Sequence, residues 1–189
     1  MTRRIPIIPT IVVLAAAAIM IALGIWQLGR LAEKQALIAR YQAALQDNAE
    51  VPWPMPPQYG SALFRRTTID CDVVRGIHPI SGKSVSGRAG WAHIARCSHP
   101  GEGMADVTIG WSRSPVAPKW EGGPVTGRIV NYGEAIRLVA EVPQAGLEPL
   151  APPDPGDLPN NHLAYAVQWF LFALTALVIY VLALKRRQR

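Results

Sequence analysis

A histidine and a tryptophan stand at the start of the last hydrophobic segment of the sequence. His162 opens this segment and Trp169 follows seven positions later, which in a helix is about 10 Å deeper on nearly the same side. Trp26 and Arg30 stand at the end of the first hydrophobic segment. An imidazole can ligate iron, aromatic rings can stack on a flat macrocycle, and an arginine can pair with its carboxylates. These residues therefore suit a slot for an iron-containing macrocycle, but aromatic residues also serve as anchors at a membrane surface.

The two hydrophobic segments are long enough to be membrane spans. Residues 5–29 and 163–184 contain no Asp, Glu, Lys or Arg, and a helix needs ~20 mostly apolar residues to cross a bilayer. The first segment exceeds the ~7–15 apolar residues of a signal peptide, so we expect a retained transmembrane helix 1. Apolar residues continue at helical spacing beyond it, and the helix is predicted to extend to about residue 46. The proline-rich stretch at 52–57 then ends it.

The positive charge of the chain is confined to its two ends. The net charge is +6, and the basic residues at the ends are Arg3, Arg4, Lys185, Arg186, Arg187 and Arg189. Residues 5–184 carry equal numbers of basic and acidic side chains, which excludes the basic face of a nucleic-acid-binding protein. Short basic flanks stay in the cytoplasm. We therefore expect both termini to be cytoplasmic and the region between the spans to be periplasmic.

The region between the spans reads as a series of short strands separated by glycine-bearing turns. Residues 61–158 predict a small antiparallel β-rich domain, either a barrel or a sandwich. The expected fold class is an α+β membrane protein, in which a two-helix transmembrane hairpin carries this extracytoplasmic domain. The spans should pair through small residues. The faces expected to meet are Ala15, Ala22 and Trp26 on the first helix, and His162, Ala166, Trp169, Ala173 and Ala176 on the second.

We expect no enzymatic activity, because the sequence contains no G-x-S-x-G elbow, P-loop or H-E-x-x-H helix. The only two cysteines, Cys71 and Cys97, could form a structural disulfide in an oxidising compartment. Alternatively, Cys71, Cys97 and His99 offer soft ligands that copper prefers. A periplasm-facing copper-handling assembly protein is therefore the second functional interpretation.

Two motifs at the membrane boundaries resemble the Surfeit locus protein 1 family. They are G-x-W-Q-L-x-R-L-x-x-K at residues 24–34 and N-x-H-x-x-Y-A-x-x-W at residues 160–169. Members of this family are cytochrome c oxidase assembly factors in bacterial inner membranes and inner mitochondrial membranes. The resemblance implies a protein of the bacterial inner membrane that binds haem a, assists its insertion into the large catalytic subunit of the oxidase, or does both. A haem a synthase is a further candidate partner, besides the lipid bilayer.

The resemblance also assigns roles to single residues. His162 matches the family histidine proposed as the iron ligand, and Trp169 matches the tryptophan beside it. Tyr165 belongs to the same motif. With Trp26 and Arg30 from the first motif, these residues form the expected cofactor-binding set, in which His162 is the only metal ligand.

Overall fold

The structure, a computed structural model, describes residues 6–99 and 103–187 of the 189-residue chain. It divides into two compact units. One unit joins the two ends of the chain, up to Ile38 and from Gly156 onward, and the other comprises Ala39–Pro155. We refer to them as the helical unit and the sheet unit.

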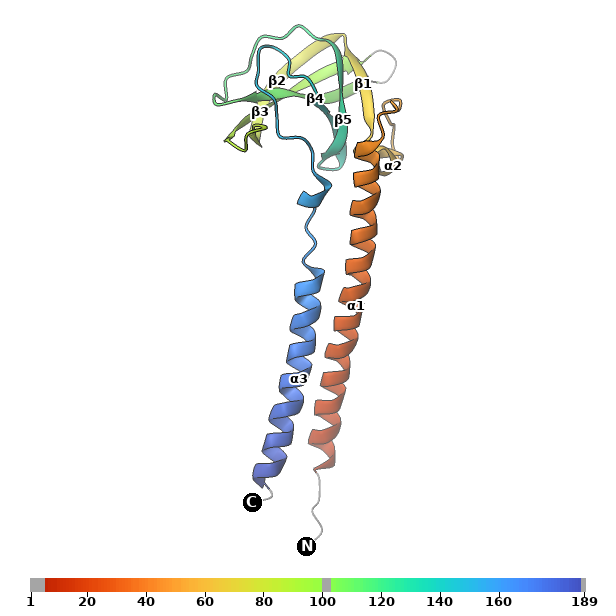
Figure 1. Cartoon of the computed structure of the whole chain (residues 1–189), viewed down its shortest axis with the longest axis vertical. Coiled ribbons are helices and arrows are strands. Elements are labelled where there is room, and N and C mark those ends of the chain that lie inside the picture. The colour runs from red at the N-terminus through yellow and green to blue at the C-terminus, as the bar shows by residue number, and fades with distance from the viewer. Residues whose placement is uncertain (1–5, 100–102, 188–189) are drawn as a thin grey trace. The chain divides into compact units, whose positions relative to one another are not determined.

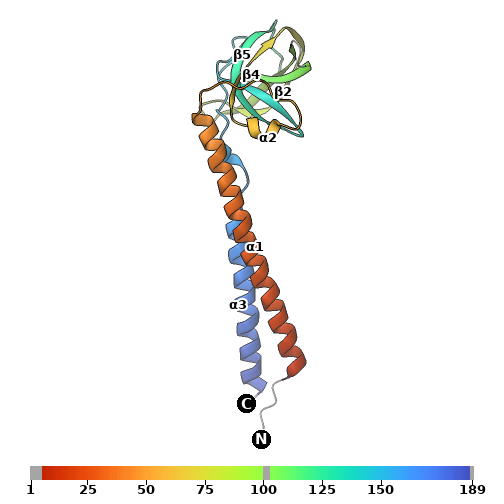
Figure 2. The same cartoon turned by 90° about the vertical axis from the view of Figure 1, so that its right-hand side faces the viewer.

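The helical unit consists of the long helix α1 (Ile7–Gln46), up to Ile38, and helix α3 (His162–Arg187). The two helices run side by side in both views (Figures 1 and 2). In the described part of the chain, these are the helices that are long and apolar enough to cross a membrane.

Small residues form the contact between the two helices. Ala17 and Gly24 are buried on α1, and Ala166 and Ala173 are buried on α3. A β-carbon at Gly24 would lie 2.5 Å from the ring of Phe170, so any larger residue would require this ring to move. Close approach of this kind is how helices associate in lipid, where water does not drive apolar surfaces together.

The expected contact face was right for α3 and wrong for α1. Ala15, Ala22 and Trp26 are all exposed, and the buried side of α1 instead carries Ala17 and Gly24. The prediction relied on alanines, whereas the notch that receives Phe170 is made by a glycine.

The sheet unit contains a single six-stranded sheet with the order β1-β5-β6-β4-β3-β2. Its strands are β1 (Arg66–Cys71), β2 (Val73–Lys83), β3 (Ala89–His99), β4 (Gly103–Ser112), β5 (Gly123–Tyr132) and β6 (Ala135–Ala140). Strands β4 and β6 pair in parallel, so the sheet is mixed, and the expected antiparallel arrangement was wrong for this pair. Two short helices, α2 (Tyr59–Ala62) and the 3₁₀ helix η1 (Pro155–Asp157), complete the fold. The α+β class is confirmed.

The sheet curls, so that β1 and β3 meet although they are not neighbours in its order. Cys71 of β1 is joined by a disulfide to Cys97 of β3, and the main-chain N–H of Asp72 donates to the carbonyl of Ser98 over 3.1 Å. The enclosed core is apolar, and its fully buried side chains include Ile69, Ile94, Val107, Ile109, Ile129 and Leu138.

The last turns of α1 belong to the sheet unit and are attached to it by two contacts. The ring of Tyr41 packs on that of Phe64, with centroids 4.8 Å apart. The guanidinium of Arg128, in β5, donates to the main-chain carbonyls of Ala44 and Asp47. These carbonyls have no partner within the helix, because the last turn of an α-helix leaves its acceptors free.

Candidate functional site

His162 is the first residue of α3, and its side chain contacts the amide of Gln27 on α1. The Nδ1 atom of His162 lies 2.7 Å from Oε1 of Gln27. An amide oxygen can only accept a hydrogen bond, so Nδ1 carries the proton in this contact. In a neutral imidazole the other nitrogen, Nε2, then holds the lone pair. His162 is thus held in the form in which Nε2 can ligate a metal.

Cationic side chains lie beside this histidine. His162, Arg30, Glu33, Lys34 and Leu37 line a hollow of about 220 Å³. Nη1 of Arg30 lies 2.5 Å from Oε2 of Glu33, in an exposed ion pair one helical turn apart. The structure therefore brings two of the predicted residues, His162 and Arg30, to the same hollow, and adds Lys34.

On α1, the predicted residues lie on one flank of the contact with α3. Taking ~100° per residue, Gly24 lies about 60° from Gln27 on one flank, where Phe170 packs against it. Arg30 and Trp26 lie about 60° and 100° from Gln27 on the opposite flank. The side chain of Trp26 is 56% exposed.

On α3, the remaining predicted residues lie on the matching flank. Phe170, which contacts α1, is about 80° round the helix from His162, whereas Tyr165 and Trp169 lie about 60° and 20° in the other direction. Tyr165 is 51% exposed. Trp169 is half-buried and meets Phe172 edge to face, with centroids 6.1 Å apart. The five predicted side chains therefore lie along the same side of the helix pair, although the aromatic rings do not line the hollow.

The predicted cofactor-binding set did not include Gln27 or Lys34. Both lie in the first boundary motif, at positions 27 and 34. Gln27 and Lys34 are seven residues apart, and so are Gly24 and Leu31. Residues with this spacing lie on one side of a helix, and a seven-residue repeat is typical of a side that packs against another helix. The repeat is the signal that could have identified Gln27 and Lys34.

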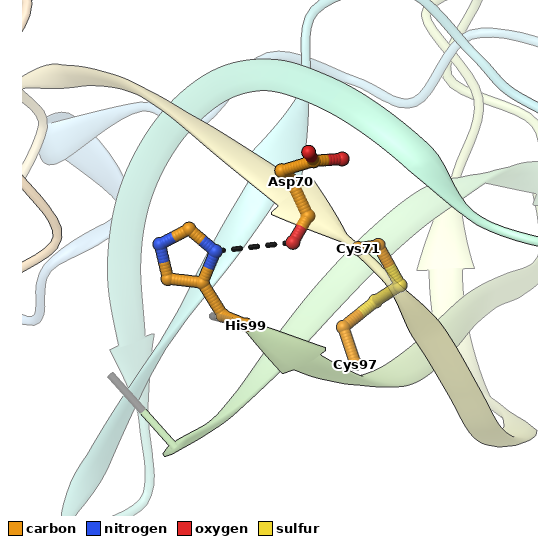
Figure 3. Close-up of a disulfide and its surroundings, with 4 residues drawn as sticks. All are labelled: Asp70, Cys71, Cys97 and His99. Carbon is orange, nitrogen blue, oxygen red and sulfur yellow. Dashed lines mark hydrogen bonds between the residues drawn. A yellow bond between two sulfur atoms is a disulfide. The ribbon is translucent and has the colours of Figure 1, made fainter. Parts of the chain in front are cut away.

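The second candidate site is occupied by a disulfide. Cys71 and Cys97 are bonded to each other and almost fully buried. Nδ1 of His99 lies 3.0 Å from the main-chain oxygen of Asp70, to which it donates (Figure 3). Metal ligation requires a thiolate, so the disulfide removes both sulfur ligands of the copper interpretation. Among residues 6–99 and 103–187, no group of three or more His, Cys, Asp and Glu is arranged to hold a metal ion.

Two basic side chains of the sheet unit, the buried His93 and the half-buried Arg137, have perturbed pKa values. Burial lowers the pKa of His93, an effect that a hydrogen bond with the backbone of Ser114 partly opposes. Nε2 of His93 lies 2.8 Å from Oγ of Ser112. Burial also lowers the pKa of Arg137, whose guanidinium lies 5.0 Å from the ring centre of Tyr132. Both residues lie in the sheet unit, whereas His162 and the residues around it belong to the helical unit.

A family model described as the SURF1 family matches residues 14–174. No curated protein matches the chain. The matched range includes both boundary motifs and the whole sheet unit.

Proposed function

Because the chain belongs to the SURF1 family, which is associated with cytochrome oxidase assembly, we propose that it holds haem a for the large catalytic subunit of that oxidase. The two long apolar helices and the family together identify a membrane protein. We propose that it acts as a carrier and assembly factor rather than an enzyme. A haem a synthase is the proposed source of the haem.

The observation that carries this proposal is the contact between His162 and Gln27. The contact engages Nδ1, so the lone pair of Nε2 is the one that would reach iron. When bound, haem a would supply an iron that an imidazole nitrogen could ligate, and carboxylates that pair with cations.

The residues around His162 fit such a group. Arg30 and Lys34 line the same hollow as the imidazole and would attract the carboxylates. Trp26, Tyr165 and Trp169 lie on the same flank of the helix pair and offer flat apolar surfaces. The partly exposed aromatic rings would keep the macrocycle in the lipid, from which an acceptor subunit could take it.

We further propose that both termini are cytoplasmic and that the sheet unit faces the periplasm of a bacterial inner membrane. The basic residues at the end of α3, Lys185, Arg186 and Arg187, support this orientation. The disulfide between Cys71 and Cys97 also supports it, because disulfides persist in oxidising compartments such as the periplasm.

The test is the haem content of the purified protein after co-expression with haem a synthesis enzymes. We expect the wild-type protein to show the absorption spectrum of bound haem a and His162→Ala to lose it at matched expression. His78→Ala is the control, because it removes an exposed imidazole of the sheet unit. A His162→Ala protein that retains the wild-type haem content and spectrum would show that His162 is not the ligand.

A further inference from the structure

We infer that Gln27 is a positioning residue that prepares His162 to bind iron. Its amide oxygen holds the imidazole in one tautomer, with the proton on Nδ1 and the lone pair on Nε2. The inference rests on the proposed function, but it concerns a property of the protein that exists before any haem is bound.

The packing of the two helices determines where the amide of Gln27 lies. Gly24, one turn before Gln27, receives the ring of Phe170 at a distance that no side chain would permit. This contact brings α1 and α3 close together one turn from Gln27. Gln27 itself is half-buried, so water has limited access to its amide. The hydrogen bond between Gln27 and His162 thus lies beside a close contact of the two helices.

The chemical consequence is a better ligand. A histidine that donates its second ring N–H to an oxygen is more basic at the ligating nitrogen, and its ring orientation is fixed. Loss of such a partner commonly lowers metal affinity by ~10–100-fold. We expect a loss of haem affinity of this size when the amide of Gln27 is replaced by an apolar group.

A simpler role for this hydrogen bond would be to hold the helices together. The chain offers a matched bond with which to test that role, because Oγ1 of Thr10 and the hydroxyl of Tyr180 also join α1 to α3. Tyr180→Phe removes this bond and leaves the ring. Tyr180 lies near the other end of the helix pair. The Tyr180→Phe variant therefore measures the effect of losing an interhelical hydrogen bond that does not involve His162.

The first experiment uses the full-length, haem-free protein in lipid nanodiscs. The histidines are labelled with ¹⁵N, and the signals of His162 are identified by their loss in His162→Ala. At a pH where histidines are neutral, the ring ¹⁵N shifts report which nitrogen carries the proton. We expect the Nδ1–H form in the wild type, in Gln27→Glu and in Tyr180→Phe, and a mixture of tautomers in Gln27→Leu. Unchanged shifts in Gln27→Leu would overturn the inference.

The second experiment measures haem a retention and reduction potential for the same variants. Gln27→Leu should lose ~10–100-fold in affinity, Tyr180→Phe should match the wild type, and Gln27→Glu should retain haem at a more negative potential, because a carboxylate makes the imidazole more basic. Equal losses in Gln27→Leu and Tyr180→Phe would reduce Gln27 to an interhelical contact and overturn the inference. Wild-type protein that takes up no haem would overturn the proposed function itself. Haem uptake that is unaffected by Gln27→Leu would overturn only the role of Gln27.

Discussion

The guanidinium of Arg128, in strand β5, donates from Nη1 to the main-chain carbonyl of Asp47, 2.9 Å away, just after the last residue of α1. The same nitrogen lies 3.3 Å from the carbonyl of Ala44, and Nη2 donates to Oδ1 of Asn48. Only 12% of the side chain is exposed. One arginine of the sheet thus satisfies carbonyls that the end of the helix leaves without helical partners.

Arg128→Met should therefore destabilise the sheet unit and release the end of α1. The variant keeps an alkyl chain but removes several charge-assisted hydrogen bonds, for an expected cost of about 3 kcal/mol. Arg66→Met is the control, because its ion pairs with Glu50 and Glu141 are more exposed and should contribute less than about 1 kcal/mol. Urea unfolding of the full-length protein in detergent measures both changes. Equal losses in the two variants would contradict the role assigned to Arg128.

Gly24→Ala should weaken the pairing of α1 and α3. The added methyl group would lie 2.5 Å from the ring of Phe170, and overpacking of this kind costs about 1–3 kcal/mol. Gly29→Ala is a matched control on the same helix, because a β-carbon there meets nothing within 4 Å. Unfolding in mixed SDS micelles compares the two. If Gly24→Ala were as stable as Gly29→Ala, the notch would not determine the helix contact.

Reduction of the disulfide between Cys71 and Cys97 should destabilise the sheet unit. The bond closes a loop across a sequence separation of 26, which corresponds to about 3.5 kcal/mol of unfolded-state entropy. We expect the urea midpoint of the wild type to fall when dithiothreitol is present during unfolding. The Cys71→Ala/Cys97→Ala double variant should already have the lower midpoint and should not respond to the reductant. A response of the double variant would mean that the reductant acts elsewhere.

The stability of the sheet unit should decrease as the pH falls below about 6.5, the ordinary pKa of histidine. Burial lowers the pKa of His93 in the folded protein, so the unfolded chain takes up a proton in this range before the folded chain does. One such proton lowers the free energy of unfolding by at most about 1.4 kcal/mol per pH unit. His93→Gln does not titrate and should show a shallower decrease between pH 6.5 and the lowered folded pKa. Parallel curves for the two proteins would exclude His93 as the source.

Turn signals in the sequence predict the strands of the sheet unit, but they do not predict strand β2. The spacing of the turn signals predicts one strand over residues 64–74, whereas in the structure Asp72 lies between two strands, β1 and β2. Strand β2 carries Gly76, Pro79 and Gly82, which are typical of turns. It lies at one end of the strand order, and proline is tolerated on an edge strand because one side of the strand has no partner to bond. Edge position is a property of the whole sheet, so the local sequence did not indicate it.

The sequence indicated the α3 side of the candidate site but not the α1 side, because the latter depends on how the two helices pack. Periodicity placed His162 and Trp169 on one side of α3, where the structure also has them. The residue opposite His162 depends on how α1 is rotated against α3, and the contacts that accompany this rotation, such as that of Gly24 with Phe170, join residues on different helices. The prediction of Trp26 as part of the contact face failed for this reason, and the predicted binding set did not include Gln27.

The hydrogen bonds between the two helices also impose an order on the making of the protein. Gln27 and His162 are 135 positions apart in the chain, and Thr10 and Tyr180 are 170 apart. A ribosome therefore completes the whole sheet unit before it adds the partners that α1 requires. Until α3 is made, the amide of Gln27 lacks its partner His162, and Gly24 lacks the ring of Phe170. In a chain that terminates before α3, both residues stay without these partners. His162 belongs to an element that follows the sheet unit in the chain, so a chain that stops within the sheet unit lacks the candidate iron ligand.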